Sequence, residues 1–528
     1  MKKIICFFFV GCVLLSLPAC FSPNGELVGN TTTRLSYEID QPYGMRQIPA
    51  GSFTMGSNDQ DVPYASRSNM KTITVSPFWI DETEITNAEY RQFTHWVRDS
   101  IIRKALIYDE DNLNSETDWG WTTDPNPNWN QNVLSDPDLY ERSYHNDLSE
   151  QGNYHINWYK NLNYNNAAVT RAMIRTLILS DDEAEEYGAA NMYSNDEDSD
   201  NEKYLRPHFQ NKLIDKRRLV YDYTWFDATA AASRLNAYEY GDREEEDGYV
   251  DVEGTPKANR QTSFIHRERV PVYPDTLTWL RDFTYNFNEP MFDKYYWHPA
   301  FDDYPVVGVS WEQARAFCHW RTEWKLYHLP QERKVFETSY RLPTEAEWEW
   351  AARAGRELAM FPWGGPYSRN SKGCFLANFK PLRGNYWADG YIYTAPAKEY
   401  FPNDYGLYNM SGNVAEWTAT AFNPMSDIFS SDLNPEYTYN ADDEDHPHFK
   451  KKVIKGGSWK DIGAFLQIGA RDYEYQDSSR CYVGFRCVKS PPFDGRVGSP
   501  KKEFKAPGRD KDKKWSGKAI KRSRRDRR

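Results

Sequence analysis

The sequence lacks the motifs that mark the catalytic centres of many soluble enzymes. It has no His-Glu-x-x-His zinc motif, no Gly-x-Ser-x-Gly nucleophile turn, no phosphate-binding loop and no glycine-rich dinucleotide fingerprint. Long apolar runs are scarce as well, and the run at residues 4–17 is shorter than the roughly 20 residues that cross a bilayer. The sequence therefore offers no support for a zinc protease, a serine hydrolase, a nucleotide-dependent enzyme or a helical transporter.

Cysteine is scarce, and only four cysteines lie after residue 20. They are Cys318, Cys374, Cys481 and Cys487. An even number of cysteines in an oxidising compartment favours disulfides. Aromatic residues are abundant, at 16% of the chain, although the mean hydropathy is −0.83. These values indicate a loop-rich globular protein with an aromatic core, not a disordered chain.

Residues 1–19 have the features of a signal peptide, because two lysines precede the apolar run and a small residue precedes Cys20. The pattern resembles a bacterial lipoprotein signal, which implies cleavage before Cys20 and lipidation of that cysteine. No aspartate follows Cys20, and this implies the outer membrane rather than the inner one. Pro18 is unusual at its position, so secretion without lipid is the alternative. Residues 20–43 are expected to form a tether.

One stretch, residues 405–417, fits neither a helix nor a strand. It reads Tyr-Gly-Leu-Tyr-Asn-Met-Ser-Gly-Asn-Val-Ala-Glu-Trp. Glycine permits positive φ and asparagine tolerates it, so backbone carbonyls can turn inward beside the side chains of Asn409 and Glu416. Such a cluster suits calcium, which takes about 6–8 oxygen ligands. The alternative is a tight turn whose polar side chains bond to their own backbone.

The same stretch resembles the signature of the formylglycine-generating-enzyme (sulfatase-modifying factor) domain family. Six further blocks follow in the family's order, at residues 45–56, 84–90, 305–311, 341–349, 455–459 and 484–487. The resemblance implies an α+β fold, a loop-rich variant of the C-type-lectin-like arrangement with little regular secondary structure. It covers residues 44–97 and 301–490, and it leaves residues 98–300 as a large mixed insertion.

The insertion and the C-terminal tail differ in charge. The insertion has acidic runs that we expect to be solvated loops, at residues 181–183, 195–200 and 244–247, and helical candidates at residues 167–179 and 227–236. Its aromatic residues either pack on the core or contact a partner. The tail, residues 491–528, has 15 Lys and Arg against 5 Asp and Glu and is expected to be disordered alone. In a secreted protein this charge favours an acidic protein, anionic lipid or the cell wall over nucleic acid.

The active enzymes of this family carry a redox cysteine pair shortly after Gly-Gly-Ser-Trp/Tyr, and that pair binds copper. Residues 460–471 occupy this place and contain no cysteine. Because copper(I) requires a soft thiolate ligand, we expect no copper and no oxidase chemistry. The resemblance also implies a structural disulfide between Cys318 and Cys487. A second disulfide between Cys374 and Cys481 rests on parity alone.

The family's calcium sites correspond to eight positions of this sequence. The first site corresponds to Asn378, Phe379, Asp389 and Tyr391, and the second to Asn409, Gly412, Val414 and Glu416. All eight residues are compatible with the family, because backbone carbonyls serve at the hydrophobic positions. The resemblance therefore implies structural calcium that holds loops in place.

The order of signal, domain blocks, insertion and basic tail resembles the gliding-motility lipoprotein branch of the family. That branch implies a non-catalytic component of the type IX secretion system, lipid-anchored at the outer membrane and facing the periplasm. It also implies self-association into a ring with a GldN/PorN-type periplasmic partner. Two alternatives are a glycan- or peptidoglycan-binding lectin-like lipoprotein and an enzyme of this fold with unrecognised chemistry.

Overall fold

The computed structural model divides into Met1–Asp40 and Gln41–Arg528, and all the residues that it describes belong to the second unit. The described ranges are 41–56, 70–107, 214–227, 264–282, 294–329, 337–381, 384–442 and 444–491, with scattered residues between 121 and 177 and single residues at 231 and 291. The predicted signal peptide, Cys20 and almost all of the basic tail lie outside these ranges, as do the three acidic runs of the insertion.

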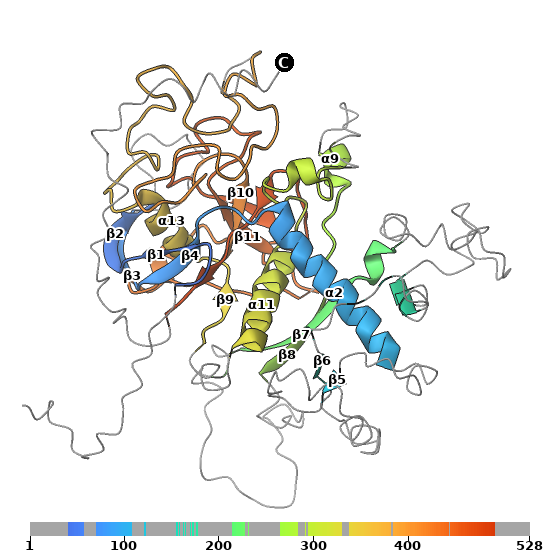
Figure 1. Ribbon diagram of the computed structural model, residues 1–528. Helices are drawn as coiled ribbons and strands as arrows, with labels where there is room; N and C mark the ends of the chain where they lie inside the picture. The colour runs from blue at the N-terminus through green and yellow to red at the C-terminus, as the bar shows by residue number, and fades with distance from the viewer. Residues whose placement is uncertain are drawn as a thin grey trace, which may run out of the picture. The chain divides into compact units, whose positions relative to one another are not determined.

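Two four-stranded sheets form the centre of the domain (Figure 1). The first has the order β1 (Met45–Ile48), β4 (Phe78–Asp81), β14 (Val488–Lys489) and β9 (Tyr340–Arg341), and all its strand pairs are antiparallel. The second has the order β12 (Asp472–Tyr475), β11 (Lys451–Lys455), β10 (Ala415–Ala421) and β13 (Val483–Gly484), and only the β10–β13 pair is parallel. The first sheet thus joins the two ends of the described chain.

Three hairpins and a few helices complete the described elements. The hairpins are β2 (Gly51–Met55) with β3 (Lys71–Val75), β5 (Trp121–Thr122) with β6 (His155–Ile156), and β7 (Val220–Phe226) with β8 (Ile265–Pro271). The helices are α2 (Asn87–Ile107), α9 (Thr278–Arg281), α11 (Trp311–His328), α13 (Glu345–Arg353) and α14 (Ser426–Phe429), with short 3-10 turns η5 (Lys216–Arg218) and η7 (Pro299–Phe301). Among the described residues no helix has the length and apolar character of a membrane span.

Local sequence explains where the main helices begin. Helix α11 starts at a capping box in which Ser310 and Gln313 each bond to the other's backbone N–H. Helix α13 starts in the same way at Thr344 and Glu347. These reciprocal bonds satisfy backbone donors that a helix end leaves without partners, which is why the same motif recurs at several helix starts.

The core is largely aromatic, as the composition indicates. Helices α2 and α11 lie side by side (Figure 1), and Tyr90 stacks on Phe317 with ring centroids 5.5 Å apart. The ring centroids of Phe93 and Trp320, also on α2 and α11, lie 5.2 Å apart. A second cluster packs α13 against β1, β3 and β4 and includes the fully buried Trp348. The second cluster joins α13 to the first sheet, and α13 also contacts β10 and β11 of the second sheet.

Candidate functional site

Residues 405–414 form a turn with the backbone that the sequence predicts, whereas residues 415–417 begin strand β10, although the sequence predicted no strand in this stretch. Asn409, Gly412 and Asn413 have φ values of 52°, 84° and 66°, in the left-handed region. A Cβ at Gly412 would lie 2.4 Å from the carbonyl oxygen of Asn378, so the neighbouring loop can approach only glycine. The N–H of Asn413 donates to that same carbonyl over 2.8 Å. The turn is therefore docked on the 378 loop by its backbone.

A buried carboxylate lies beneath the turn. Glu84, which is fully buried, accepts the side-chain amides of Asn409 at 3.1 Å and Asn413 at 3.0 Å. Burial raises the pKa of the Glu84 carboxyl to about 8; Arg486 opposes this shift and Glu416 adds to it. The two asparagines thus fasten the turn to the start of α2, far away in the sequence.

Glu416 lies in the same buried region but is fully engaged. Its two oxygens accept from the Arg486 guanidinium at 2.5 and 2.6 Å, and one of them also accepts from Trp348 Nε1 at 2.7 Å. Both side chains of the Glu416–Arg486 pair are 0% exposed. A carboxylate held by two guanidinium nitrogens and an indole is a fixed structural partner, not a mobile base.

The first predicted calcium set contains a carboxylate that a cation would suit. The Asp389 carboxylate accepts the backbone N–H of Phe379 at 2.8 Å and that of Tyr391 at 3.4 Å. Burial raises the pKa of Asp389, and no Lys or Arg pairs with it among the described residues. Asn378, the fourth member, donates its side-chain amide to Tyr393. These residues fit a hard cation, which would supply the positive charge that no Lys or Arg among the described residues gives to Asp389.

The second predicted set fits a cation less well in this arrangement. Glu416 is held by Arg486, and the amide nitrogen of Asn409 points at Glu84 and the Ala397 carbonyl. The described residues contain no group of three or more His, Cys, Asp or Glu placed to share one metal ion. Calcium here would thus depend on amide and backbone oxygens, including those of Gly412 and Val414. Both calcium sets stay predictions.

The segment at residues 460–471 lines a small hollow of about 340 Å³, counted to its open mouth. Lys460, Asp461, Asp472 and Tyr482 are among its lining residues. One Asp461 oxygen accepts from the backbone N–H and hydroxyl of Ser458 at 3.0 and 2.5 Å, so this carboxylate caps a local turn. Burial raises the pKa of Asp472, and Asp461 adds to that shift. The hollow offers oxygen and ammonium groups but, within residues 460–471, no sulfur.

A model of the sulfatase-modifying factor enzyme 1-like domain matches residues 36–300 and 283–491. The chain belongs to this family. The match confirms the predicted family and its loop-rich α+β fold. It also takes in residues 98–300, and the predicted domain boundaries stay a prediction.

Individual relatives include proteins named as active and as inactive. The formylglycine-generating enzyme of Bos taurus is 36% identical over 35% of this chain and 44% of its own length. The inactive C-alpha-formylglycine-generating enzyme 2 of Bos taurus is 33% identical, covering 35% and 50%. The formylglycine-generating enzyme of Thermomonospora curvata is 36% identical, covering 36% and 56%. The chain thus spans about half the length of the curated relatives that it matches.

Among solved structures, PvdO from Pseudomonas aeruginosa aligns with 84% of this chain and 94% of its own, at 15% identity and a TM-score of 0.36.

The sulfatase-modifying factor domain of this chain has four free thiols among its described residues. The sulfur atoms of Cys318 and Cys487 lie 3.3 Å apart in the core, so they touch without being bonded. Cys374 is exposed, whereas Cys481 is fully buried. The structure therefore brings the first predicted pair together but forms neither disulfide, and both bonds stay predictions.

The insertion is joined to this domain by packed aromatics and ion pairs. Tyr221 and Tyr223 of β7 are buried and stack on each other 5.2 Å apart, and Tyr221 donates to Glu323 of α11 at 2.5 Å. For these residues the structure answers the question that the sequence left open: they pack on the core.

Of the two predicted helices, residues 167–179 are described in part and residues 227–236 almost not at all.

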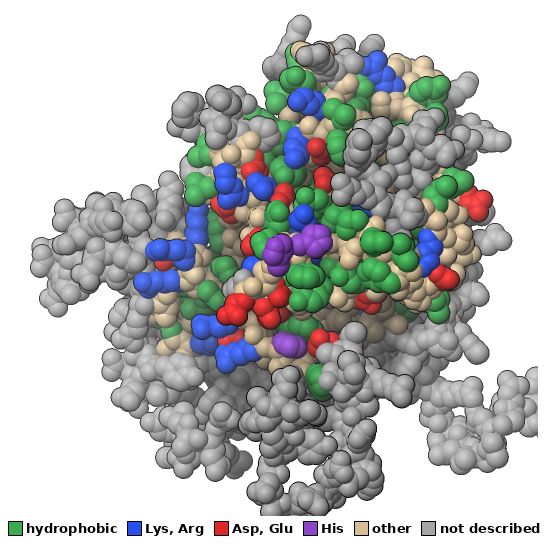
Figure 2. All heavy atoms as spheres, turned by 180° about the vertical axis from the view of Figure 1, so that it is seen from behind, with side chains coloured by type: hydrophobic (Ala, Val, Ile, Leu, Met, Phe, Trp, Pro, Cys, Tyr) green, Lys and Arg blue, Asp and Glu red, His purple; other side chains and the backbone are tan. Residues whose placement is uncertain are grey.

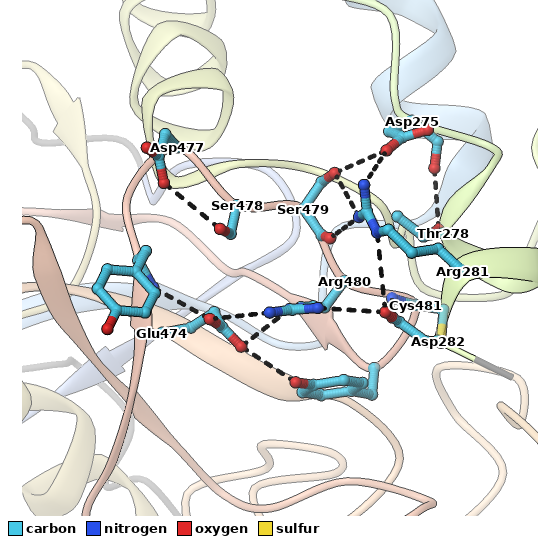
Figure 3. Close-up of polar contacts among 12 residues, drawn as sticks. Asp275, Thr278, Arg281, Asp282, Glu474, Asp477, Ser478, Ser479, Arg480 and Cys481 are labelled. Carbon is cyan, nitrogen blue, oxygen red and sulfur yellow. Dashed lines mark hydrogen bonds and ion pairs between the residues drawn. The ribbon is translucent and has the colours of Figure 1, made fainter. Parts of the chain in front are cut away.

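A cluster of polar contacts, here called the polar clip, joins α9 of the predicted insertion to β12 and the segment after it (Figure 3). It consists of Arg281, Asp282, Glu474 and Arg480. Arg480 donates to Glu474 at 3.0 Å and to Asp282 at 3.3 Å, and Asp282 accepts the backbone N–H of Cys481 at 3.1 Å. Arg281 pairs with Asp275 beside it. The clip fixes the insertion next to Tyr482, which lines the hollow at residues 460–471.

Sequence reasoning did not single out Glu84, Asn413 or Arg486 as site residues. Each lies inside a family block, but only Arg486 has apolar neighbours on both sides, the buried Phe485 and Cys487, whereas Glu84 lies in a polar stretch. A charged residue in an apolar block is a usable signal, because such a charge requires a buried partner. The identity of that partner is not readable, because Asn409 and Glu84 are 325 residues apart.

Proposed function

We propose that this chain is a non-catalytic structural lipoprotein of the type IX secretion machinery, of the type called GldK in gliding bacteria and PorK in non-gliding relatives. The observation that carries the non-catalytic part is the absence of sulfur from residues 460–471, where the active enzymes of this family carry their copper-binding cysteines. Asp461 in this segment caps a turn through Ser458, so a structural contact occupies the place of a reactive one. The relative named inactive C-alpha-formylglycine-generating enzyme 2 supports the reading that this fold also serves without that activity.

The proposed role is to present a rigid body for assembly. The buried contacts of Glu416, Arg486 and Trp348 suit a framework that keeps one shape, and structural calcium at Asp389 would fasten a further loop. The described surface carries exposed apolar side chains among charges of both signs (Figure 2). Phe226 and Ile265, at 58% and 49% exposure, are two of them. Such surface suits contact with a GldN/PorN-type partner and with further copies in a ring.

The order of segments supports the membrane part of the proposal. A lipid on Cys20 would hold the protein at the outer membrane, facing the periplasm, and would raise the effective concentration of neighbouring copies. A sister lipoprotein of the same machinery, GldJ, shares the domain and is the alternative within this branch.

Purification from membranes in mild detergent tests this role. We expect the lipidated chain to bring a GldN/PorN-type protein with it and to form closed rings in electron micrographs. Cys20→Ser is the control, because it removes the lipid and leaves the folded domain untouched, and it should leave the protein in the soluble periplasmic fraction. A wild-type chain that is monomeric, unlipidated and without a partner would refute the proposal.

A glycan-binding role is the second candidate, favoured by exposed aromatic residues near the first predicted calcium set. Trp387 and Phe401 are 65% and 73% exposed, and aromatic faces of this kind stack on sugar rings. Isolated peptidoglycan should then retain the wild-type protein and the control Trp297→Ala, but not Trp387→Ala. This result would support the second role. Capture of a protein partner with no retention on peptidoglycan would exclude it.

A further inference from the structure

A second hollow lies at the start of helix α13, and of residues 460–471 only Arg471 lines it. Figure 1 shows α13 beside the β2–β3 hairpin. The hollow measures about 450 Å³, counted to its open mouth. Its lining residues include Glu345 of α13, Lys71 of β3, Ser426 of α14, Ser430, Glu436 and Arg471. The family resemblance assigns this hollow no role.

Five buried charged side chains lie beneath it, each no more than 5% exposed. They are Arg353, Glu349, Lys455, Glu345 and Arg471. They form one chain of ion pairs: Arg353–Glu349 at 2.6 Å, Lys455–Glu349 at 3.1 Å, Lys455–Glu345 at 3.6 Å and Arg471–Glu345 at 2.9 Å. Three cations face two carboxylates, so the chain carries a net charge of +1. The Trp348 ring, 5.8 Å from Lys455 Nζ, separates this group from Glu416.

Two members of this group, Glu345 and Arg471, line the hollow, and Arg471 has a donor without an acceptor. One terminal nitrogen donates to the Asn423 carbonyl at 3.1 Å, and the other to the Ser426 hydroxyl and to Glu345. Its Nε is buried and has no hydrogen-bond partner, although the residue is only 6% exposed. A buried N–H donor without an acceptor is costly, as is an uncompensated buried charge. Both costs would be removed by an anion in the hollow.

We infer that this hollow binds a carboxylate group, with Arg471 Nε donating to one of its oxygens. The first turn of α13 adds the partial positive charge of a helix N-terminus, and the hydroxyls of Ser426 and Ser430 are further donors. The charged lining residues are two cations, Lys71 and Arg471, and two carboxylates, Glu345 and Glu436, so a singly charged anion meets less repulsion here than a phosphate dianion would.

The surroundings of the mouth indicate how the carboxylate is presented. Ile428 and Leu433 are 66% and 60% exposed, and Met70, next to Lys71, is 54% exposed. The Lys71 ammonium donates to the Ser430 carbonyl, which brings the two apolar segments together. An acidic side chain or chain end with apolar neighbours would bury this rim, and a free small carboxylate would not. This inference does not depend on the secretion role, because the site is built wholly from residues of this chain.

The test is a thermal-unfolding titration of the full chain with sodium acetate against sodium chloride at equal ionic strength. Acetate should raise the melting temperature saturably, by a few degrees, because it binds only the folded state. Arg471→Lys removes Nε, and Ser430→Leu fills the hollow without touching the ion pairs; both should abolish the rise. Arg480→Lys, whose side chain does not line the hollow, is the matched control and should keep it.

A blocked tripeptide with glutamate between two leucines separates the two sources of carboxylate. If the tripeptide reaches half-saturation at a concentration at least tenfold lower than acetate does, the site binds a protein segment. If the two concentrations are equal, the site binds a free carboxylate. The inference fails if acetate acts no differently from chloride, if phosphate stabilises more than acetate does, or if the acetate effect survives both Arg471→Lys and Ser430→Leu. Loss of the secretion role would leave these results unchanged.

Discussion

At the scale of single residues, the buried charges of this protein are mostly matched by contact. Glu416 faces Arg486, and Glu349 faces Arg353 and Lys455. Such pairs hold a shape, because removing one partner leaves a buried charge that costs about 3–5 kcal/mol. Lys452 differs: its ammonium lies 4.0 Å above the Trp311 ring and donates to the Tyr439 carbonyl, while the side chain is fully buried.

Lys452 should make the stability of the protein depend on pH. Burial lowers its pKa from 10.5 to about 7; Arg315 adds to that shift and Glu312 opposes it. Between these two values the unfolded chain binds one more proton than the folded one. The free energy of unfolding should therefore rise with pH across this window, with a slope of up to about 1.4 kcal/mol per pH unit from this residue.

Urea unfolding of Lys452→Met from pH 6 to pH 9 measures this contribution. Between pH 7 and pH 9 the slope of the variant should be lower than the wild-type slope by up to about 1.4 kcal/mol per pH unit, while the rise from Lys489, whose pKa burial lowers to about 6, should remain. The variant should be the more stable protein at pH 6, since the cost of protonating a buried amine is gone. Lys451→Met is the neighbouring control and should keep the wild-type slope. Equal slopes in Lys452→Met and the wild type would show that the ammonium is not destabilised by burial.

At the scale of elements, the turn at residues 405–414 and the helix starts follow from local sequence. The positive φ of Asn409, Gly412 and Asn413 and the capping boxes at Ser310 and Thr344 need only neighbours along the chain, so they could be predicted. The pairing of Asn409 with Glu84 could not, because the fold alone brings them together. For the same reason, the contact of Glu416 with Arg486 could not be predicted from the sequence.

Gly412 of the turn can be compared with Gly384, a glycine outside the turn that has a similar backbone conformation. Gly412 and Gly384 have nearly equal φ values, 84° and 86°, but a Cβ at Gly412 would meet the Asn378 carbonyl oxygen, while one at Gly384 would meet nothing within 4 Å. We expect Gly384→Ala to cost about 1–2 kcal/mol from backbone strain. Gly412→Ala should cost about 1–3 kcal/mol more, because the 378 loop must also move.

Chemical unfolding of both variants measures the difference between them. Similar losses would show that the close approach of the 378 loop is not needed for stability. If calcium binds at Asp389, Gly412→Ala should also weaken the stabilisation that calcium gives, and Gly384→Ala should affect it less.

At the scale of the whole molecule, described residues of the predicted insertion, such as Tyr221, pack on the helices of the family blocks. The blocks could be placed from the sequence because their motifs recur in a fixed order; the family match confirms the family, and the block bounds stay a prediction. The insertion could not be placed, because its attachment depends on distant pairs such as Arg480 with Asp282 and Tyr221 with Glu323. The unbonded contact of Cys318 with Cys487 likewise follows from packing and not from spacing.

The account depends most on the claim that this framework has lost the family's oxidase chemistry. The most direct measurement is the copper content and oxygen consumption of the purified full chain, supplied with copper and a sulfatase-derived cysteine peptide, beside the Thermomonospora curvata enzyme as a positive control. We predict no stoichiometric copper and no conversion of the peptide cysteine to formylglycine. One bound copper ion per chain together with oxygen-dependent conversion of the peptide would contradict the account.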